Sequence, residues 1–318
     1  MPDDYVWDGS GEPDPEVERL EKILGRLRWE RPAPRWPARV IRFPRPVLAI
    51  AAGVAMTAAA AWVLTRPAQN TWQVARLQGA PVIGEQRLRG AGRLAVGEWL
   101  QTDAGSRAQL QVGQIGHVEI EPNTLLRLVE ARWTNHRLAL KRGEIHARIY
   151  APPRLFFVET PSATAVDLGC AYDLKVDEAG ASMLRVTHGF VSFEWGGRES
   201  LVPAGAACVT RPGVGPGTPY YQDASGEFRE ALARLDFDNG GEPELGVILR
   251  ESRRRDVLSL WHLLGRTGAN DRGRLFDRMA GLVEIPDGVT REAVVALDKE
   301  VLRLWWEELG LEESGWWR

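Results

Sequence analysis

Five histidines are the side chains of this 318-residue chain best suited to metal binding or to proton transfer near neutral pH. They are scattered, and none forms an H-E-x-x-H pair or a comparable ligand spacing. They are His117, His136, His146, His188 and His262. The sequence therefore predicts neither a metal site nor a histidine-based catalytic centre.

Three aspartates, Asp167, Asp173 and Asp177, are close enough in sequence to compare with the carboxylate pairs of acid–base catalysis. Two of them flank one predicted strand and alternate with apolar neighbours, so solvated strand faces explain them more simply. A G-x-S-x-G elbow and a Walker loop are absent from the sequence, and the run GVGPG lies in a Pro/Gly-rich segment. We therefore expect no enzyme activity and no cofactor.

The two cysteines, Cys170 and Cys208, are too few for a disulfide scaffold and have neither zinc-site nor C-x-x-C spacing. They could still form one disulfide. The 40 basic and 43 acidic residues give a formal charge of -3, which supplies no global field to attract nucleic acid. Direct nucleic-acid binding is therefore not expected.

Residues 46–65, PVLAIAAGVAMTAAAAWVLT, carry no charge. About 20 helical residues at about 1.5 Å each span the ~30 Å hydrocarbon core of a bilayer. A buried helix of a globular domain is the alternative, but soluble helices seldom lack a polar face over such a length. We expect one transmembrane helix here.

Charges beside this span predict its orientation. Residues 26–45 carry seven arginines and a single acidic residue, Glu30, whereas the stretch just after the span carries Arg66 and Arg76. The seven arginines are Arg26, Arg28, Arg31, Arg35, Arg39, Arg42 and Arg45. The positive-inside rule then predicts an uncleaved anchor in a bacterial inner membrane, with residues 1–45 cytoplasmic and residues 66–318 periplasmic or otherwise extracytoplasmic.

The cytoplasmic segment, residues 1–45, is predicted to contain one short amphipathic helix, beginning at Asp14 and Pro15, and then a Pro/Arg-rich tether. Apolar residues at helical spacing form one face of this helix: Val17, Leu20, Ile23, Leu24 and Leu27. A lone helix of about 15 residues is marginal in water, so this face needs a partner protein or a bilayer surface. The glutamates nearby favour a protein over anionic lipid.

Residues 70–210 consist of short apolar or alternating runs separated by glycine and polar turns. This pattern predicts a mainly β exported domain, as an antiparallel sandwich, a jelly roll or a β-solenoid, without choosing among them. Residues 211–223 are predicted to be an irregular Pro/Gly linker, and residues 224–318 an all-α region with Asn270 and Thr290 as helix N-caps. That region is either a bundle packed on the β domain or a separate protein-binding module.

Several segments of the β region resemble the FecR-type domain, in the order of that family. They are GEWLQT (97–102), GSRAQL (105–110), VEIEPNT (118–124), LAL before GEI (138–145), FVETP (157–161), AVDLG (165–169) and HGFV (188–191). Each is a turn with a strand, in which glycine permits positive φ and aliphatic residues alternate inward. These motifs supply architecture and no catalytic group.

The resemblance implies a membrane-anchored regulator. In FecR-like proteins the cytoplasmic end binds an extracytoplasmic-function sigma factor, and the exported domain receives a signal from an envelope protein. The resemblance therefore implies a sigma factor at the apolar face of residues 17–27 and an envelope partner of unknown identity. Cys170 stands where the family commonly has threonine, which with Cys208 permits a disulfide in an oxidising periplasm. The alternative function is an envelope scaffold with no sigma-factor partner.

Overall fold

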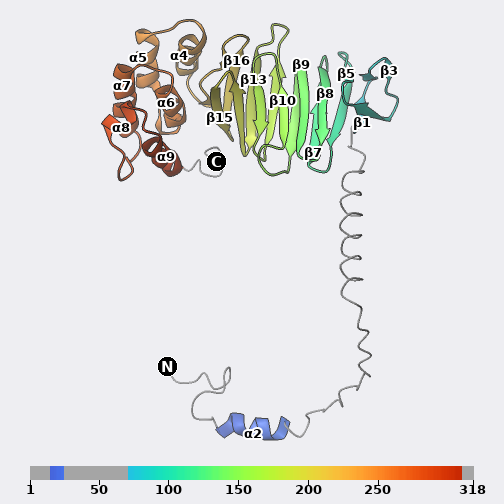
Figure 1. Cartoon of the computed structure of the whole chain (residues 1–318), viewed down its shortest axis with the longest axis horizontal. Helices are drawn as coiled ribbons and strands as arrows, with labels where there is room; N and C mark the ends of the chain where they lie inside the picture. Colours follow the sequence, from blue (N-terminus) through green and yellow to red (C-terminus); the bar gives the residue numbers. More distant parts are fainter. Residues whose placement is uncertain (1–14, 25–70, 310–318) are drawn as a thin grey trace, which may run out of the picture. The chain divides into compact units, whose positions relative to one another are not determined.

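The computed structural model describes residues 15–24 and 71–309, and the chain divides into two units, Met1–Arg66 and Pro67–Arg318 (Figure 1). Among the described residues, no helix is both long enough and apolar enough to cross a bilayer. The predicted span, residues 46–65, lies outside them, as does the Pro/Arg-rich tether.

Helix α2 (Pro15–Leu24) is the described part of the first unit and begins at the predicted proline. Its first turn carries Glu16 and Glu18 and its last turn carries Lys22, which complements the helix dipole. The acidic start and the proline together explain why the helix begins here.

The second unit begins with strands that run from residue 71 to residue 221. Their bounds are β1 (Thr71–Gln78), β2 (Val82–Ile83), β3 (Gln86–Arg87), β4 (Ala91–Ala95), β5 (Trp99–Gln101), β6 (Arg107–Val112), β7 (Gly116–Ile120), β8 (Leu125–Arg132) and β9 (Asn135–Ile149). The others are β10 (Phe156–Glu159), β11 (Thr164–Asp167), β12 (Ala171–Val176), β13 (Ser182–His188), β14 (Phe190–Trp195), β15 (Arg198–Pro203), β16 (Ala206–Arg211), β17 (Gly215–Pro216) and β18 (Tyr220–Tyr221).

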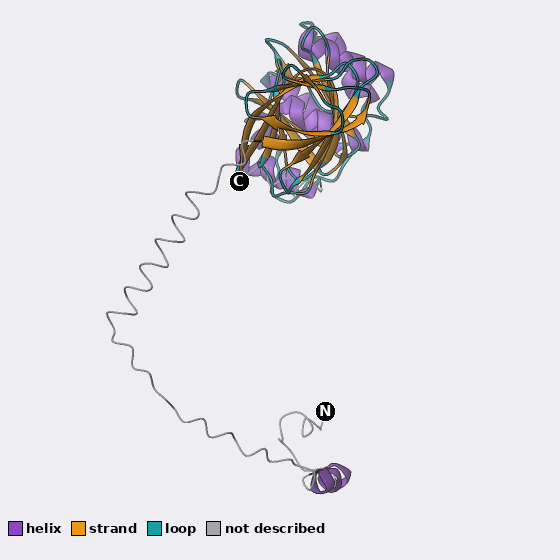
Figure 2. Ribbon diagram, turned by 90° about the vertical axis from the view of Figure 1, so that its right-hand side faces the viewer, coloured by secondary structure: helices purple, strands orange, loops and turns teal. Residues whose placement is uncertain are grey.

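The strands form two sheets that share the long strand β9. One sheet has the order β4-β1-β6-β7-β9-β12-β13-β16, with β17 and β18 paired to β16. The other has the order β3-β2-β5-β8-β9-β10-β11-β14-β15. Only β9 and β10 pair in parallel among these ladders, and the strands curl around the interior (Figure 2). The predicted mainly antiparallel β fold is confirmed.

Strand β9 changes sheets at Gly143. Its residues up to Arg142 pair with β8, and from Gly143 onward it pairs with β12. Gly143 has φ of 97°, and a Cβ there would lie 2.4 Å from Thr124 Cα. A glycine is therefore required where the chain passes between the sheets. On either side of it, alternate residues such as Leu138 and Ile145 point into the core.

Helices complete the second unit beyond β15 and β16 (Figure 1). They are α4 (Gly226–Phe237), α5 (Glu242–Glu251), the 3-10 turn η2 (Arg254–Asp256), α6 (Val257–Leu264), α7 (Ala269–Ala280), α8 (Arg291–Val295) and α9 (Lys299–Glu308). All eight residues of α6 are buried. The sheets and helices share one apolar core, so the helical region is a bundle packed on the β domain.

The segment predicted as an irregular linker, residues 211–223, instead contains β17 and β18. Its five residues from Gly215 to Pro219 are all buried, and the N–H of Gly217 donates to Val209 O at 2.8 Å. A Cβ on Gly217 would lie 2.7 Å from the ring of Phe237 in α4. Small residues are therefore needed where the chain passes between sheet and helices. The prolines fit because β17 is a short strand that needs few backbone donors.

Candidate functional site

The apolar face of α2 is the candidate partner site predicted from the sequence. Leu20, Ile23 and Leu24 are 57%, 58% and 59% exposed, and their i, i+3 and i+4 spacing places them side by side. Val17 lies in α2 without a described side chain, and Leu27 lies outside the described residues. The three described members thus form a continuous exposed aliphatic surface.

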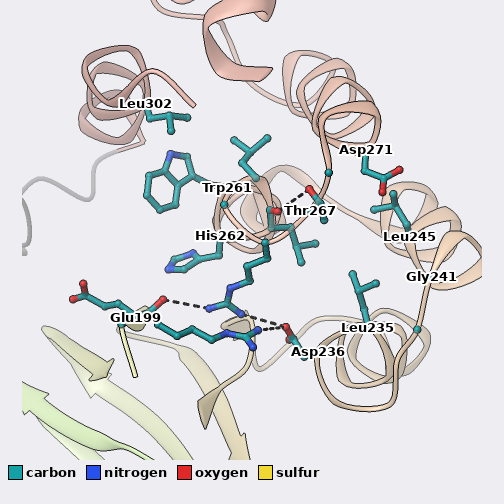
Figure 3. Close-up of a pocket in the computed structure, with 18 of the residues that line it drawn as sticks. Glu199, Leu235, Asp236, Gly241, Leu245, Trp261, His262, Thr267, Asp271 and Leu302 are labelled. Carbon is teal, nitrogen blue, oxygen red and sulfur yellow. Dashed lines mark hydrogen bonds and ion pairs between the residues drawn. The ribbon is translucent and has the colours of Figure 1, made fainter. Parts of the chain in front are cut away.

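A cavity of about 840 Å³ lies between the β14–β15 turn and the helices. Leu235 and Leu245 line one side of it, and Trp261 and Leu302 line the other (Figure 3). Its volume falls within the range of roughly 300–1,000 Å³ that small-molecule sites occupy. The cavity is also the place where sheet residues and helix residues face one another.

Asp236, near the end of α4, accepts hydrogen bonds at the base of this cavity. Arg198 Nη2 of β15 lies 2.8 Å from Asp236 Oδ1, and Arg266 Nη1 lies 3.3 Å from the same oxygen. The backbone N–H of Thr218 donates to Asp236 Oδ2 at 2.6 Å. The Asp236 side chain is only 4% exposed, so this carboxylate depends on these donors for its stability.

Arg266 extends the same network into the sheet. Its Nη2 donates to Ser200 Oγ at 2.6 Å and to Glu199 O at 3.3 Å. Burial lowers the pKa of the Arg266 guanidinium, and the Asp236 carboxylate opposes that shift. One guanidinium thus connects the residues after α6 to both β15 and α4.

His262 of α6 also links the helices to β15. Its Nε2 accepts the N–H of Leu201 at 3.1 Å, so its Nδ1 carries the proton and donates to Leu258 O at 2.9 Å. Burial lowers the pKa of His262 to about 3. Both ring nitrogens bind backbone groups, which suits a neutral structural histidine rather than a metal ligand.

Cys170 and Cys208 are both free and buried, so the disulfide considered above is absent. Cys170 Sγ donates to Asp167 Oδ2 at 2.7 Å, and Cys208 Sγ donates to Gly217 O at 3.2 Å. Strand β13 separates β12, which follows Cys170, from β16, which contains Cys208. Two strand spacings are roughly 10 Å, beyond the Cα separation of about 7 Å that a disulfide tolerates.

The expectation that all three aspartates are solvated is wrong for Asp167, which is 1% exposed. It accepts the N–H of Gly169 at 2.7 Å as well as the Cys170 thiol. Burial raises the pKa of Asp167 to about 6. The Asp-x-Gly spacing is a turn signal that could have indicated this local bond, although nothing local indicates the burial.

Asp173 and Asp177 make contacts that do not involve Asp167. Asp173 Oδ1 lies 2.6 Å from His146 Nδ1 on the partly exposed face of β12 and β9, and Asp177 Oδ1 accepts the N–H of Ala181 in a turn. Within residues 15–24 and 71–309, no three His, Cys, Asp or Glu side chains form a group that could hold a metal ion.

The comparison with protein families agrees with the resemblance read from the sequence. Residues 98–192 match the family described as FecR protein. No curated protein matches the chain. Two crystal structures of a "putative anti-sigma factor" from Parabacteroides distasonis are similar at 16% identity and a TM-score of 0.35, covering 43% of this chain. The chain spans 64% of the length of those structural relatives.

The matched segment begins immediately before β5 and ends inside β14. It therefore contains the hairpins β6–β7, β8–β9 and β12–β13, and the Gly143 crossing between the two sheets. The motifs that carried the resemblance fall within it, apart from Gly97 at its border. Residues 98–192 of the chain are thus similar to the FecR protein family.

Proposed function

We propose that the protein is a single-pass inner-membrane regulator of the FecR type, which relays an envelope signal to a cytoplasmic extracytoplasmic-function sigma factor by protein–protein contact. The FecR match over residues 98–192 is the observation that carries this proposal. The uncharged residues 46–65 and the arginines before them support the anchor and its orientation.

In this proposal the sigma factor covers Leu20, Ile23 and Leu24 of α2. Each side chain is more than half exposed, and burying the three together stabilises a complex by on the order of 3 kcal/mol. Such a contact alone is weak. A small change in the accessibility of this face of α2 is therefore enough to release or recruit the sigma factor.

The test is recovery of the full chain from membranes in mild detergent, followed by identification of the proteins that travel with it. A sigma factor should accompany the wild type and be lost from an Ile23→Asp variant, because a charge within the apolar face opposes its burial. Glu18→Gln is the matched control, since Glu18 lies on the opposite side of α2 at 100° per residue.

Two results would reject the proposal. The first is recovery of the full chain from the aqueous fraction without detergent, which removes the anchor. The second is a membrane-bound chain with which no sigma factor co-purifies, or with which a sigma factor co-purifies equally in the Ile23→Asp variant. Envelope proteins in that second sample would instead favour a scaffold.

A further inference from the structure

The cavity of about 840 Å³ between the β14–β15 turn and the helices is formed by residues that follow the FecR-like segment. Its walls come from residues 196–199, from both sides of the α4–α5 and α6–α7 turns, and from Leu302 of α9. The FecR-like segment ends at residue 192. The similarity to FecR proteins therefore assigns no role to this cavity, and its own side chains indicate what it can bind.

The upper walls of the cavity are apolar. Leu235 and Leu245 line one side, and Trp261 and Leu302 line the other (Figure 3). The Trp261 ring is held in place by the Trp306 ring, 4.4 Å away between centroids. Such walls suit the hydrocarbon part of a ligand, because apolar surface on both sides leaves water when they meet.

The base of the cavity carries a positive charge that has no counter-ion. Arg198 and Arg266 share the single Asp236 carboxylate. Arg266 uses both of its terminal nitrogens in bonds to the chain, whereas Arg198 has an acceptor only at Nη2 among the described residues. The Nε of Arg198 is buried without an acceptor, and the side chain is 28% exposed. Arg198 therefore has hydrogen-bond donors left for a ligand.

Glu199 lines the cavity but directs its charge elsewhere. Successive side chains of a strand point to opposite faces, so Glu199 lies on the other face of β15 from Arg198 and Ser200. There its carboxylate accepts the hydroxyl of Ser192, and Figure 3 shows it pointing away from Asp236. The backbone carbonyl of Glu199 is the part that bonds within the cavity, where it accepts from Arg266.

The remaining acidic residues of the lining, Glu242 and Asp271, are compensated. Arg274 Nη1 lies 2.6 Å from Glu242 Oε2 and 3.7 Å from Asp271 Oδ1. Both acids lie in the first turn of a helix, α5 and α7, where the helix dipole offsets negative charge. They are also 70% and 40% exposed, so solvent screens them. His262 is neutral at neutral pH because burial lowers its pKa to about 3.

We propose that this cavity binds a small monocarboxylate with an apolar body. The carboxylate accepts hydrogen bonds from Arg198, whose planar fork matches its geometry, and the apolar body packs against Leu245, Trp261 and Leu302. A single negative charge matches the one positive charge that Asp236 leaves at the base. This inference goes beyond the proposed function and does not depend on it, because the cavity is formed within residues 196–302.

The experiment is isothermal titration calorimetry of the full chain in mild detergent. The ligands are 4-phenylbutyrate, 4-phenylbutyramide and 4-phenylbutylamine, which share one apolar body and differ in the charge of one end. Each ligand is also titrated into detergent alone, which gives the baseline for partition into micelles. The difference between the three affinities then reports the charge preference of the cavity.

The wild type should bind the carboxylate about tenfold more tightly than the amide, because a charge-assisted hydrogen bond is roughly twice as strong as a neutral one. The amine should bind most weakly. Arg198→Gln should lose the preference for the carboxylate and keep the affinity for the amide. Its matched control is Arg211→Gln, which removes an arginine from an exposed pair with Asp238 outside the cavity and should keep the preference.

A second variant leaves the charged base intact. Leu302→Trp should fill part of the cavity and weaken the carboxylate and the amide by similar factors, at least about tenfold. Leu304→Trp is its matched control, since Leu304 lies on the same helix, is 37% exposed and does not line the cavity. This pair of variants tests the site even if Arg198→Gln disturbs the environment of Asp236.

Four results would overturn the inference. They are no binding of any of the three ligands by the folded wild type, equal affinities for the carboxylate and the amide, tighter binding of the amine, and a carboxylate preference that survives in a folded Arg198→Gln variant. Equal affinities would indicate a merely apolar cavity, and tighter binding of the amine would show that Glu242 and Asp271 dominate. None of these results bears on the membrane anchor or on the sigma factor.

Discussion

Asp167 is a buried carboxyl group whose ionisation opposes folding. Burial raises its pKa in the fold to about 6, although the bonds from Cys170 and Gly169 lower it. In the unfolded chain an aspartate titrates at about 3.9. Between these two values the folded state holds more protons than the unfolded state, so the contribution of Asp167 to stability falls as pH rises.

The Asp167→Asn variant should therefore gain stability relative to the wild type as pH rises from 4 to 7. Two pKa units correspond to on the order of 2–3 kcal/mol. Urea unfolding of the full chain in detergent at pH 4, 5, 6 and 7 measures this difference. Asp173→Asn, at the partly exposed contact with His146, is the control. A difference between Asp167→Asn and wild type that stays constant with pH would contradict the assignment.

At the scale of elements, β9 is the connection on which both sheets depend. It holds β8 and β10 along its first half and β7 and β12 along its second half. Its change of direction at Gly143 combines a positive φ with a close approach to Thr124. A side chain at this position would disturb the backbone of two strands at once.

Gly143→Ala should destabilise the protein by about 3 kcal/mol or more, because both strain and overlap oppose the methyl group. Gly84→Ala is the matched control: Gly84 has φ of 58° but nothing within 4 Å of its Cβ position. That change should cost only about 1 kcal/mol. Denaturant midpoints of the two variants provide the comparison, and equal losses would show that the contact with Thr124 is unimportant.

At the scale of the whole molecule, residues 71–309 behave as one folded unit. The apolar core runs from Trp72 in β1 to Trp306 in α9 without a break. The charged connection between the sheets and the helices is the network of Arg198, Asp236 and Arg266. A structural change in the β domain can therefore reach the helices through direct contacts.

Arg266→Met should destabilise the sheets and helices together by about 3–5 kcal/mol, since it removes a donor from the buried Asp236. Helix loss is followed by circular dichroism, and opening of the sheets by the reactivity of the Cys170 thiol. The midpoints of the two unfolding transitions should shift to the same lower denaturant concentration. Arg211→Gln, at an exposed pair with Asp238, should change little. Separate shifts would show that the helical region folds independently.

The sequence predicted features that depend on near neighbours along the chain. Alternating apolar residues gave the strands, the Asp14-Pro15 signal gave the start of α2, and Thr290 is the N-cap of α8, where its side chain accepts from Ala293 N. The prediction of Asn270 as an N-cap is wrong, because Gly268 is the N-cap of α7 and Asn270 lies inside the helix. The ordered FecR motifs identified the domain for the same reason, since each motif is a local turn with a strand.

Only the tertiary structure decided which distant residues meet. The burial of Asp167, the bonding of Asp236 by Arg198 and Arg266, and the separation of Cys170 from Cys208 all depend on the order of strands in the sheets. Strand order is set by pairing between residues far apart in the chain, whereas side-chain periodicity repeats every two residues in a strand and about every 3.6 in a helix. The periodicity can be read from the sequence. The environment of a polar side chain is determined only by which strands pair in the folded sheets.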